Sequence, residues 1–217
     1  MADKIQNAYE SSKNIYDDVL TQGNIFSKLY IKLFRSGTND NDIAQTVLSY
    51  IPNDFSGNLL DVPVGTAVFT EHKWIVLKDA HITCLDYSMD MLEQAKKRFD
   101  GYTYIKCIQG DVSNLKMNAE SYDIVVSMNG FHAFPNKKKA FQETWRVLKP
   151  GGTFIACFYI KGKSKRTDWL VNHILSKKGW FTLPFQTEEE LRNILKEMYK
   201  QIYLHMDGSM VYFCCTK

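Results

Sequence analysis

The stretch NLLDVPVGTAVFT, residues 58–70, decides the fold. It begins with an apolar run that is typical of a buried strand, and it reaches Asp61 where that strand should end. A tight turn with Pro63 and Gly65 follows, and the chain then enters a predicted helix. A strand, a turn of small residues and a helix form a nucleotide-binding cradle. Glycine lets the backbone approach a ligand, and the first N–H groups of a helix have no intrahelical partner.

The order of residues in this turn differs from the dinucleotide-binding fingerprint. That fingerprint is G-x-G-x-x-G, which places a pyrophosphate on the helix N-terminus. Here the order is Asp61-x-Pro63-x-Gly65-x-Ala67. A carboxylate at the first position repels a pyrophosphate and attracts a cation, so the turn favours a positively charged cofactor over a dinucleotide. Taken alone, the turn is equally compatible with an ordinary strand-to-helix connection.

Length and composition predict one globular domain. The chain has 217 residues, of which 45% are hydrophobic and 24% charged. A net charge of +3 predicts no nucleic-acid partner. The polar N-terminus predicts no secretory signal, and the longest apolar run, residues 154–160, is too short for a transmembrane segment. Five cysteines without metal-ligand spacing predict reduced thiols, a cytoplasmic protein and no metal site.

From residue 59 onward, strand and helix patterns alternate along the chain. Apolar runs such as Ile124-Val125-Val126 predict a parallel sheet covered on both faces, in a doubly wound α/β domain. Two β-rich runs around Asp207-Gly208 predict an antiparallel C-terminal hairpin. The fold class is therefore a Rossmann-like sheet of about seven strands, mostly parallel, with helices on both faces. The expected strands are 59–62, 81–86, 102–109, 123–128, 153–160, 201–206 and 210–216, and the expected helices between them are 67–76, 89–99, 137–148 and 187–199.

The remaining segments flank this core within a single domain, 1–217. Residues 1–52 form an N-terminal helical cap, in which two helical pieces within 1–35 and a helix over 41–50 pack on the sheet or cover the ligand site, with Tyr9 or Tyr16 reaching in. Residues 58–160 are the cofactor-binding core. Residues 161–186 contain a basic stretch, which is either a lid or acceptor-binding insertion or a solvated loop. Residues 187–217 contain the C-terminal helix, opened by a capping box of Thr187 and Glu190, and the hairpin.

Acidic and amide side chains follow successive predicted strands. Asp61, Asp86, Asp111 and Asn129 each come at or just after a strand end, where ligands bind in open α/β sheets. At these places Asp86 can accept hydrogen bonds from two ribose hydroxyls, and Asp111 can meet an adenine amino group. A single acid there is usually a helix cap or a turn residue. Three of them at successive strand ends predict a ligand site.

Four motifs between residues 58 and 156 resemble those of small class I S-adenosylmethionine-dependent methyltransferases. The resemblance is to the kind that includes quinone-biosynthesis enzymes, the methyltransferase domain 11 type. LDVPVGTA at 60–67 is similar to the glycine-rich cofactor loop, and LDYSMDML at 85–92 to the D-x-S-x-x-M-L segment. GDV at 110–112 resembles the adenine-side loop, and RVLKPGG at 146–152 matches the V-L-K-P-G-G turn. Pro63 and Ala67 depart from the usual pattern, since both positions are commonly glycine.

The resemblance implies S-adenosylmethionine as cofactor and a small-molecule methyl acceptor as partner. It implies that Asp61 and Gly65 line the methionine end and that Asp86 holds the ribose. Tyr87 and Met91 would then pack on the adenine. The residues that it implies for cofactor binding are Asp61, Pro63, Gly65, Thr66, Asp86, Tyr87, Ser88, Met91, Gly110, Asp111, Val112, Asn129 and Gly130.

The reaction expected from this resemblance is methyl transfer by in-line displacement. The protein needs no nucleophile of its own and holds acceptor, methyl and sulfur in line. His132, just after a predicted strand, is the candidate general base if the acceptor arrives protonated, and its alternative is a loop histidine without a catalytic role. Tyr16, Tyr159, Trp169 and His173 are candidates for an acceptor pocket, with packing as the alternative. Two other function classes stay open: a non-catalytic protein that binds S-adenosylmethionine or S-adenosylhomocysteine, and a nucleotide-binding oxidoreductase, which the missing G-x-G-x-x-G disfavours.

Overall fold

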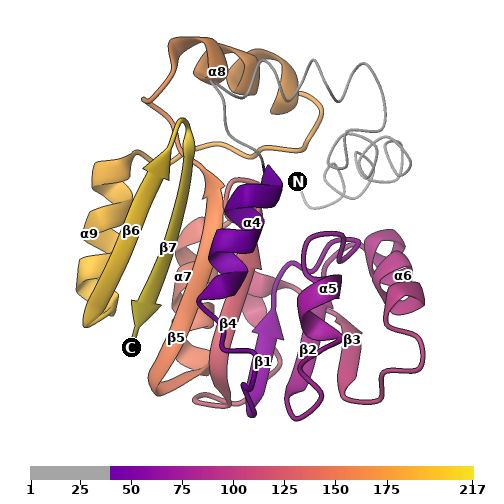
Figure 1. Cartoon of the computed structure of the whole chain (residues 1–217). Helices are drawn as coiled ribbons and strands as arrows, with labels where there is room; N and C mark the ends of the chain where they lie inside the picture. The colour runs from indigo at the N-terminus through magenta and orange to yellow at the C-terminus, as the bar shows by residue number, and fades with distance from the viewer. Residues whose placement is uncertain (1–39) are drawn as a thin grey trace.

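The computed structural model describes residues 40–217, which are drawn in colour in Figure 1. The first described element is α4, Asp40–Ser49, which agrees with the helix predicted over 41–50. The helical pieces predicted within residues 1–35, with Tyr9 and Tyr16, lie outside the described residues. Among residues 40–217, no helix combines the length and the apolar character that a membrane crossing requires.

One seven-stranded sheet runs through the molecule in the order β3-β2-β1-β4-β5-β7-β6. Strands β3 to β5 of this order pair in parallel, and β7 pairs antiparallel with both β5 and β6. The predicted fold class and the C-terminal hairpin are confirmed. The strands are β1 (Asn58–Asp61), β2 (His81–Asp86), β3 (Ile105–Gln109), β4 (Tyr122–Met128), β5 (Leu148–Tyr159), β6 (Gln201–Asp207) and β7 (Met210–Thr216).

Helices cover both faces of the sheet, as the apolar strands predicted. Alternate residues of β1 belong to different cores: Leu59 packs with α4 and with the helices α5 (Glu71–Trp74) and α6 (Met89–Arg98). Leu60 instead packs with α7 (Lys137–Val147) and α9 (Glu188–Met198). Because every second side chain of a strand points to the same face, a strand buried on both faces must be apolar throughout.

Side-chain caps fix where several helices begin. The capping box predicted from Thr187 and Glu190 is present at the start of α9. Ser88 accepts a hydrogen bond from the backbone N–H of Met91 at the start of α6, and Asn136 accepts one from Lys139 at the start of α7. These caps satisfy N–H groups that the helix itself leaves unpaired.

Three expected boundaries were wrong. The helix expected over 67–76 is only α5, because Ala67 has a positive φ of 64° and the chain turns until Thr70. Strand β3 begins at Ile105 rather than 102, after a turn in which the N–H of Ile105 bonds the carbonyl of Tyr102. Strand β5 begins at Leu148 rather than 153, because Leu148 pairs with Tyr122 and a register shift accommodates the Pro-Gly-Gly sequence.

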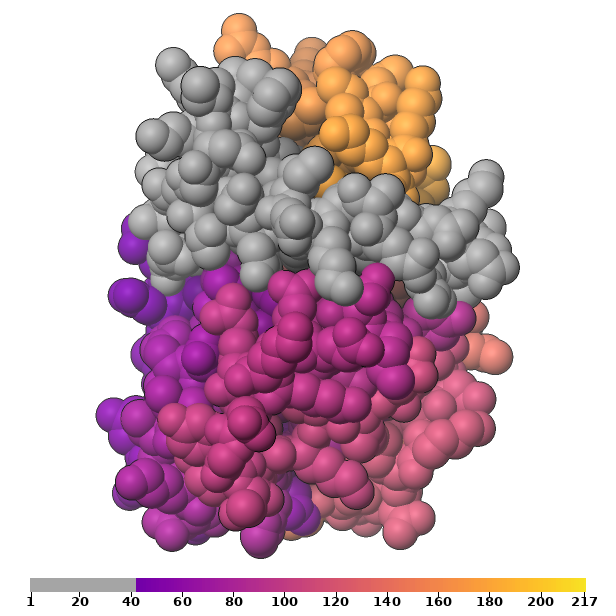
Figure 2. All heavy atoms as spheres, turned by 90° about the vertical axis from the view of Figure 1, so that its right-hand side faces the viewer, coloured from indigo at the N-terminus to yellow at the C-terminus, as the bar shows by residue number. Residues whose placement is uncertain are grey.

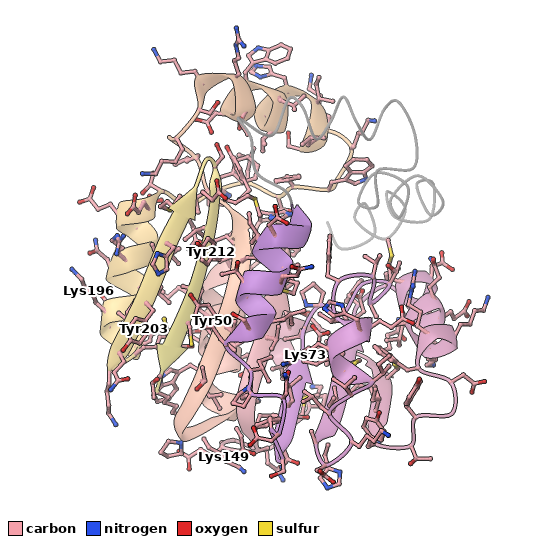
Figure 3. All side chains as sticks on the ribbon, viewed as in Figure 1. Tyr50, Lys73, Lys149, Lys196, Tyr203 and Tyr212 are labelled. Atoms are coloured by element: carbon pink, nitrogen blue, oxygen red, sulfur yellow. The ribbon has the colours of Figure 1, made fainter. Side chains whose placement is uncertain are left out.

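Two lysines, Lys73 and Lys137, are buried. The run Lys137-Lys138-Lys139 predicts an exposed helix start, but Lys137 is only 9% exposed, because its ammonium group turns inward to backbone carbonyls. Lys73 of α5 donates to the carbonyl of Ile51, 2.7 Å away, so it ties α5 to the chain ahead of β1 (Figure 3). Burial lowers the pKa of both lysines, to about 8 for Lys137.

Residues 161–186 form a separate layer at the end of β5. They contain α8 (Lys165–Leu170) and a short π-helix, Val171–Leu175. Figure 1 shows α8 beyond the C-terminal end of β5, and Figure 2 shows the same segment in orange at that end of the molecule. A third apolar cluster holds the segment in place, formed by Tyr159, Val171, Leu175, Trp180, Phe181 and Phe185.

Candidate functional site

A cavity of about 260 Å³ lies at the C-terminal ends of β1, β2 and β4. Ten of the implied cofactor residues line it, in agreement with the rule that open α/β sheets bind ligands at this edge. These ten are Pro63, Gly65, Thr66, Asp86, Tyr87, Met91, Gly110, Asp111, Val112 and Asn129. Asp61, Ser88, Gly130 and His132 are outside that lining.

The sequence did not single out one wall of the cavity. Residues 133–136, between β4 and α7, contribute Ala133, Phe134, Pro135 and Asn136 to the lining. No motif covers these positions. Their only sequence signal was that they follow Asn129 at the end of a predicted strand. Val68 and Phe69, in the turn that was expected to be helical, also line the cavity.

Asp86 connects the glycine-rich turn to the end of β2. Its Oδ2 accepts a hydrogen bond from the N–H of Gly65 at 2.8 Å, and its Oδ1 accepts one from Ser88 at 2.8 Å. The side chain is buried in the cavity wall, and burial raises the pKa of its carboxyl to about 6. A carboxylate has about four acceptor sites, so Asp86 keeps capacity to accept hydrogen bonds from a ligand.

Asp61 lies beneath the turn and not on the cavity surface. It is fully buried, and its Oδ2 accepts hydrogen bonds from Thr70 Oγ1 at 3.0 Å and from Trp74 Nε1 at 2.8 Å. Among the described residues, its Oδ1 has no hydrogen-bond partner. Burial raises the pKa of this carboxyl to about 7. This position differs from the one that the family resemblance implies, which is the wall of the methionine end.

Gly130 brings two loops of the site into contact. A Cβ atom at this position would lie 2.3 Å from Cδ of Pro63 and 2.8 Å from Cζ of Phe134. Only glycine allows such an approach. Gly130 therefore acts on the shape of the site without lining the cavity, and its neighbour Asn129 lines it with a positive φ of 53°.

The residues that follow β2 and β3 line a further part of the cavity. Asp111 accepts hydrogen bonds from the N–H and the hydroxyl of Ser113, at 2.7 and 2.8 Å, and so caps a short turn that begins with the buried Val112. Met91 is buried in α6, whereas Tyr87 is 41% exposed. Acidic and apolar side chains thus meet in this part of the cavity.

His132 has the contacts of a packed side chain. It is buried, its ring stacks on Phe181 with 4.1 Å between centroids, and its Nδ1 accepts a hydrogen bond from the N–H of Tyr159 at 3.2 Å. Burial lowers the pKa of its imidazole to about 3. These contacts favour the alternative of a non-catalytic histidine.

The three other acceptor-pocket candidates that the structure describes also lie outside the cavity lining. The hydroxyl of Tyr159 donates to Asp168 Oδ1 at 2.6 Å. Trp169 is 58% exposed and stacks on His173, with 5.1 Å between ring centroids. The structure thus brings ten of the expected cofactor residues together around the cavity, and the described acceptor candidates lie outside its lining.

Comparison with protein families agrees with this geometry. Residues 60–156 match the family described as methyltransferase domain. A demethylmenaquinone methyltransferase of Staphylococcus epidermidis is 37% identical over 101 residues, which are 44% of this chain and 40% of that protein. An uncharacterised chloroplastic methyltransferase of Arabidopsis thaliana is 31% identical over 134 residues, 59% of this chain and 38% of that protein. The chain spans about half the length, or less, of the curated relatives it matches.

Solved structures share the fold at low sequence identity. A Thermotoga maritima protein, described as an S-adenosylmethionine-dependent methyltransferase and possible histamine N-methyltransferase, superposes with a TM-score of 0.71 at 18% identity, over 98% of this chain and 99% of that one. Phosphoethanolamine N-methyltransferase 2 of Haemonchus contortus, solved with S-adenosylmethionine, gives a TM-score of 0.69 at 15% identity, over 87% and 56% of the two chains.

Proposed function

We propose that this chain carries a class I methyltransferase domain and transfers a methyl group from S-adenosylmethionine to a small-molecule acceptor. The observation that carries the proposal is the buried Asp86, which stands in the cavity wall at the end of β2 and holds the glycine-rich turn through Gly65. The non-catalytic alternative requires the same site without turnover, and no observation favours it.

The residues present fit the cofactor. Asp86 has acceptor sites left for the ribose hydroxyls, and Met91 and Val112 offer apolar contacts for the adenine. The turn at Gly65 lines the cavity beside Asp86 and would lie against the methionine end. When bound, S-adenosylmethionine would supply a methyl group on a positively charged sulfur. The acceptor would bond the methyl carbon, and the sulfur would leave with the electron pair of the broken bond.

The chain's own work is to position the acceptor and exclude water. Phe134, Pro135 and Met128 give the cavity that Asn129 also lines an apolar surface. Such a surface lowers the local polarity and orients an apolar acceptor toward the cofactor. A base role for His132 is not part of this proposal, because Phe181 and the N–H of Tyr159 occupy its ring.

Calorimetric titration tests the cofactor site. S-adenosylmethionine and S-adenosylhomocysteine are titrated into the native chain, Asp86→Ala and the matched control Asp100→Ala, whose carboxylate is exposed. We expect binding to the native chain and to Asp100→Ala, and a Kd about tenfold or more higher in Asp86→Ala, because charge-assisted hydrogen bonds are lost. A folded native chain that binds neither ligand would sink the proposal, and binding of NAD instead would revive the oxidoreductase.

A second assay separates the enzyme from a non-catalytic binding protein. Reduced demethylmenaquinone is the first acceptor to test, because curated relatives are named for methylation of demethylmenaquinone. Formation of S-adenosylhomocysteine that depends on the acceptor and falls in Asp86→Ala supports the enzyme. Tight cofactor binding without turnover across a panel of quinol, amine and thiol acceptors favours the non-catalytic alternative.

A further inference from the structure

Two segments far apart in the sequence meet beside the cofactor cavity. One is the loop of residues 129–136 between β4 and α7, whose last four residues line the cavity. The other is the segment of residues 161–186 after β5. The ring of His132 on the loop stacks on Phe181 of the segment, so the two already share an apolar contact.

The three polar groups of Thr182 bond this loop and the first residue of α7. Its N–H donates to the carbonyl of His132 at 2.9 Å, and its hydroxyl donates to the carbonyl of Ala133 at 2.8 Å. Its carbonyl accepts from the ammonium group of Lys137 at 2.6 Å. A segment that only covers the sheet needs no such set, whereas these three hydrogen bonds fix the position of Thr182 in all directions.

Lys137 also connects the loop to the segment of residues 161–186. Its Nζ donates to the carbonyl of Phe134 at 3.1 Å as well as to that of Thr182, and it lies 5.9 Å from the centroid of the Phe185 ring. Lys137 thus bonds one residue of the cavity wall and one residue of the segment at once. We call Lys137 and Thr182, with the carbonyls they bond, the clasp.

The clasp bonds backbone carbonyls of the cavity wall. The carbonyls of Ala133 and Phe134 accept its hydrogen bonds, and the same two residues line the cavity. Ala133 and Phe134 also donate their N–H groups to the carbonyl of Gly130, whereas the earlier part of the loop is held to β5 by the N–H of Asn129 on the carbonyl of Cys157 and by Nδ1 of His132, which accepts from the N–H of Tyr159. Release of the clasp would therefore let the wall shift while the sheet stays intact.

We propose that Lys137 and Thr182 are positioning residues for methyl transfer, because the clasp sets the place of the Ala133–Phe134 wall against the bound cofactor. The segment 161–186 is then the outer side of the active site, and it acts through the wall. This inference rests on the proposed function, since it assigns the cavity to S-adenosylmethionine.

The test uses the full chain and S-adenosylhomocysteine as ligand. Thr182→Val replaces the hydroxyl by a methyl group at nearly constant volume, whereas Thr182→Ser keeps the hydroxyl. Lys137→Met removes the ammonium group, and Lys138→Met is its matched control, because Lys138 is the exposed neighbour on α7. Calorimetry gives the Kd of each variant. The rate of tryptic cleavage at the exposed Lys177 and Lys178 reports whether the segment is still held.

We expect Thr182→Val and Lys137→Met to raise the Kd about five- to tenfold, as the loss of one buried hydrogen bond or more implies, and to speed cleavage. Thr182→Ser and Lys138→Met should match the native chain. Faster cleavage with an unchanged Kd in the two clasp variants would overturn the positioning role, since the segment would be loose and the wall unmoved. If Lys137→Met does not fold, the Val and Ser variants at Thr182 decide alone. Absence of binding to the native chain itself would refute the proposed function and this inference with it.

Discussion

The indole of Trp74 donates a hydrogen bond to the carboxylate of Asp61, with 2.8 Å between Nε1 and Oδ2. Both side chains are fully buried, so the bond joins α5 to the end of β1 beneath the glycine-rich turn. Thr70 adds a second hydrogen bond to the same oxygen. A carboxylate held this way braces the turn from below, whereas Asp86 holds it from the cavity side.

Trp74→Phe should destabilise the protein by about 2 kcal/mol. The substitution keeps most of the apolar volume, but it leaves the buried Asp61 carboxylate with one hydrogen bond fewer, which costs about 1–3 kcal/mol. Urea unfolding gives the difference in free energy. Trp169→Phe is the control, because Trp169 is 58% exposed, and it should stay within about 0.5 kcal/mol of the native chain. An equal effect of both substitutions would contradict a role for the buried bond.

The stability of Asp61→Asn relative to the native chain should rise as the pH rises from 5 to 8. Burial raises the pKa of Asp61 from 3.8 to about 7, so the folded state binds more protons than the unfolded state between these values. The stability that this carboxyl contributes is therefore present when it is protonated and is lost as the pH rises toward 7, by up to about 4 kcal/mol. Asparagine has no such titration, and its oxygen still accepts from Trp74 and Thr70.

The melting temperatures of Asp61→Asn and the native chain at pH 5, 6, 7 and 8 check this sign. Asp86, whose pKa burial raises to about 6, titrates in both proteins and largely cancels in the difference. Asp123→Asn is the opposite control, because the hydrogen bond with Lys149 holds the pKa of Asp123 below its usual value. The melting temperature of Asp123→Asn relative to the native chain should not rise toward pH 8. A difference for Asp61→Asn that is flat across the series would rule out the raised pKa.

Gly130→Ala should abolish cofactor binding and cost several kcal/mol of stability. The added methyl group would overlap Cδ of Pro63, Oγ of Ser127 and Cζ of Phe134, so the two loops of the site must separate. Gly151→Ala is the control: φ is +77° there but the space around it is open, so the cost should be about 1 kcal/mol of backbone strain. Thermal unfolding and S-adenosylhomocysteine titration measure both effects. Native-like binding by Gly130→Ala would show that the loops do not need this approach.

Thr187→Ala should lower the free energy of unfolding by about 1 kcal/mol without changing cofactor affinity. The hydroxyl of Thr187 caps α9 by accepting from the N–H of Glu190, and such caps contribute about 0.5–2 kcal/mol. Thr187→Ser keeps the hydroxyl and should be close to native. A weaker affinity in Thr187→Ala would mean that α9 is coupled to the site through the apolar core that both share.

Much of the fold followed from local signals in the sequence. The double-sided burial of Leu59 and Leu60, the capping box at Thr187 and the turn at Gly208 each depend on residues close together in the chain, and each is present. The part of the cavity lining that follows the strand ends was predictable for the same reason, because strand ends of a parallel sheet converge at one edge.

The rest depended on contacts that spacing does not encode. The indole of Trp74 turns Asp61 away from the cavity, and the ring of Phe181, 49 positions after His132, packs that histidine. Lys137 is buried because Thr182 offers it a carbonyl across the loop. In each case a side chain of ambiguous character was decided by a partner from another element, so the sequence pattern alone could not place it.

The position of β7 between β5 and β6 has a consequence for how the chain is synthesised. The ribosome releases β6 before the strand that must separate it from β5. Until residues 210–216 emerge, β5 lacks β7, the strand that pairs with its outer edge in the final sheet, although the strands β1 to β5 are already complete. The nascent chain can therefore assemble this parallel half first, and an open strand edge of this kind is where a chaperone would be expected to engage it.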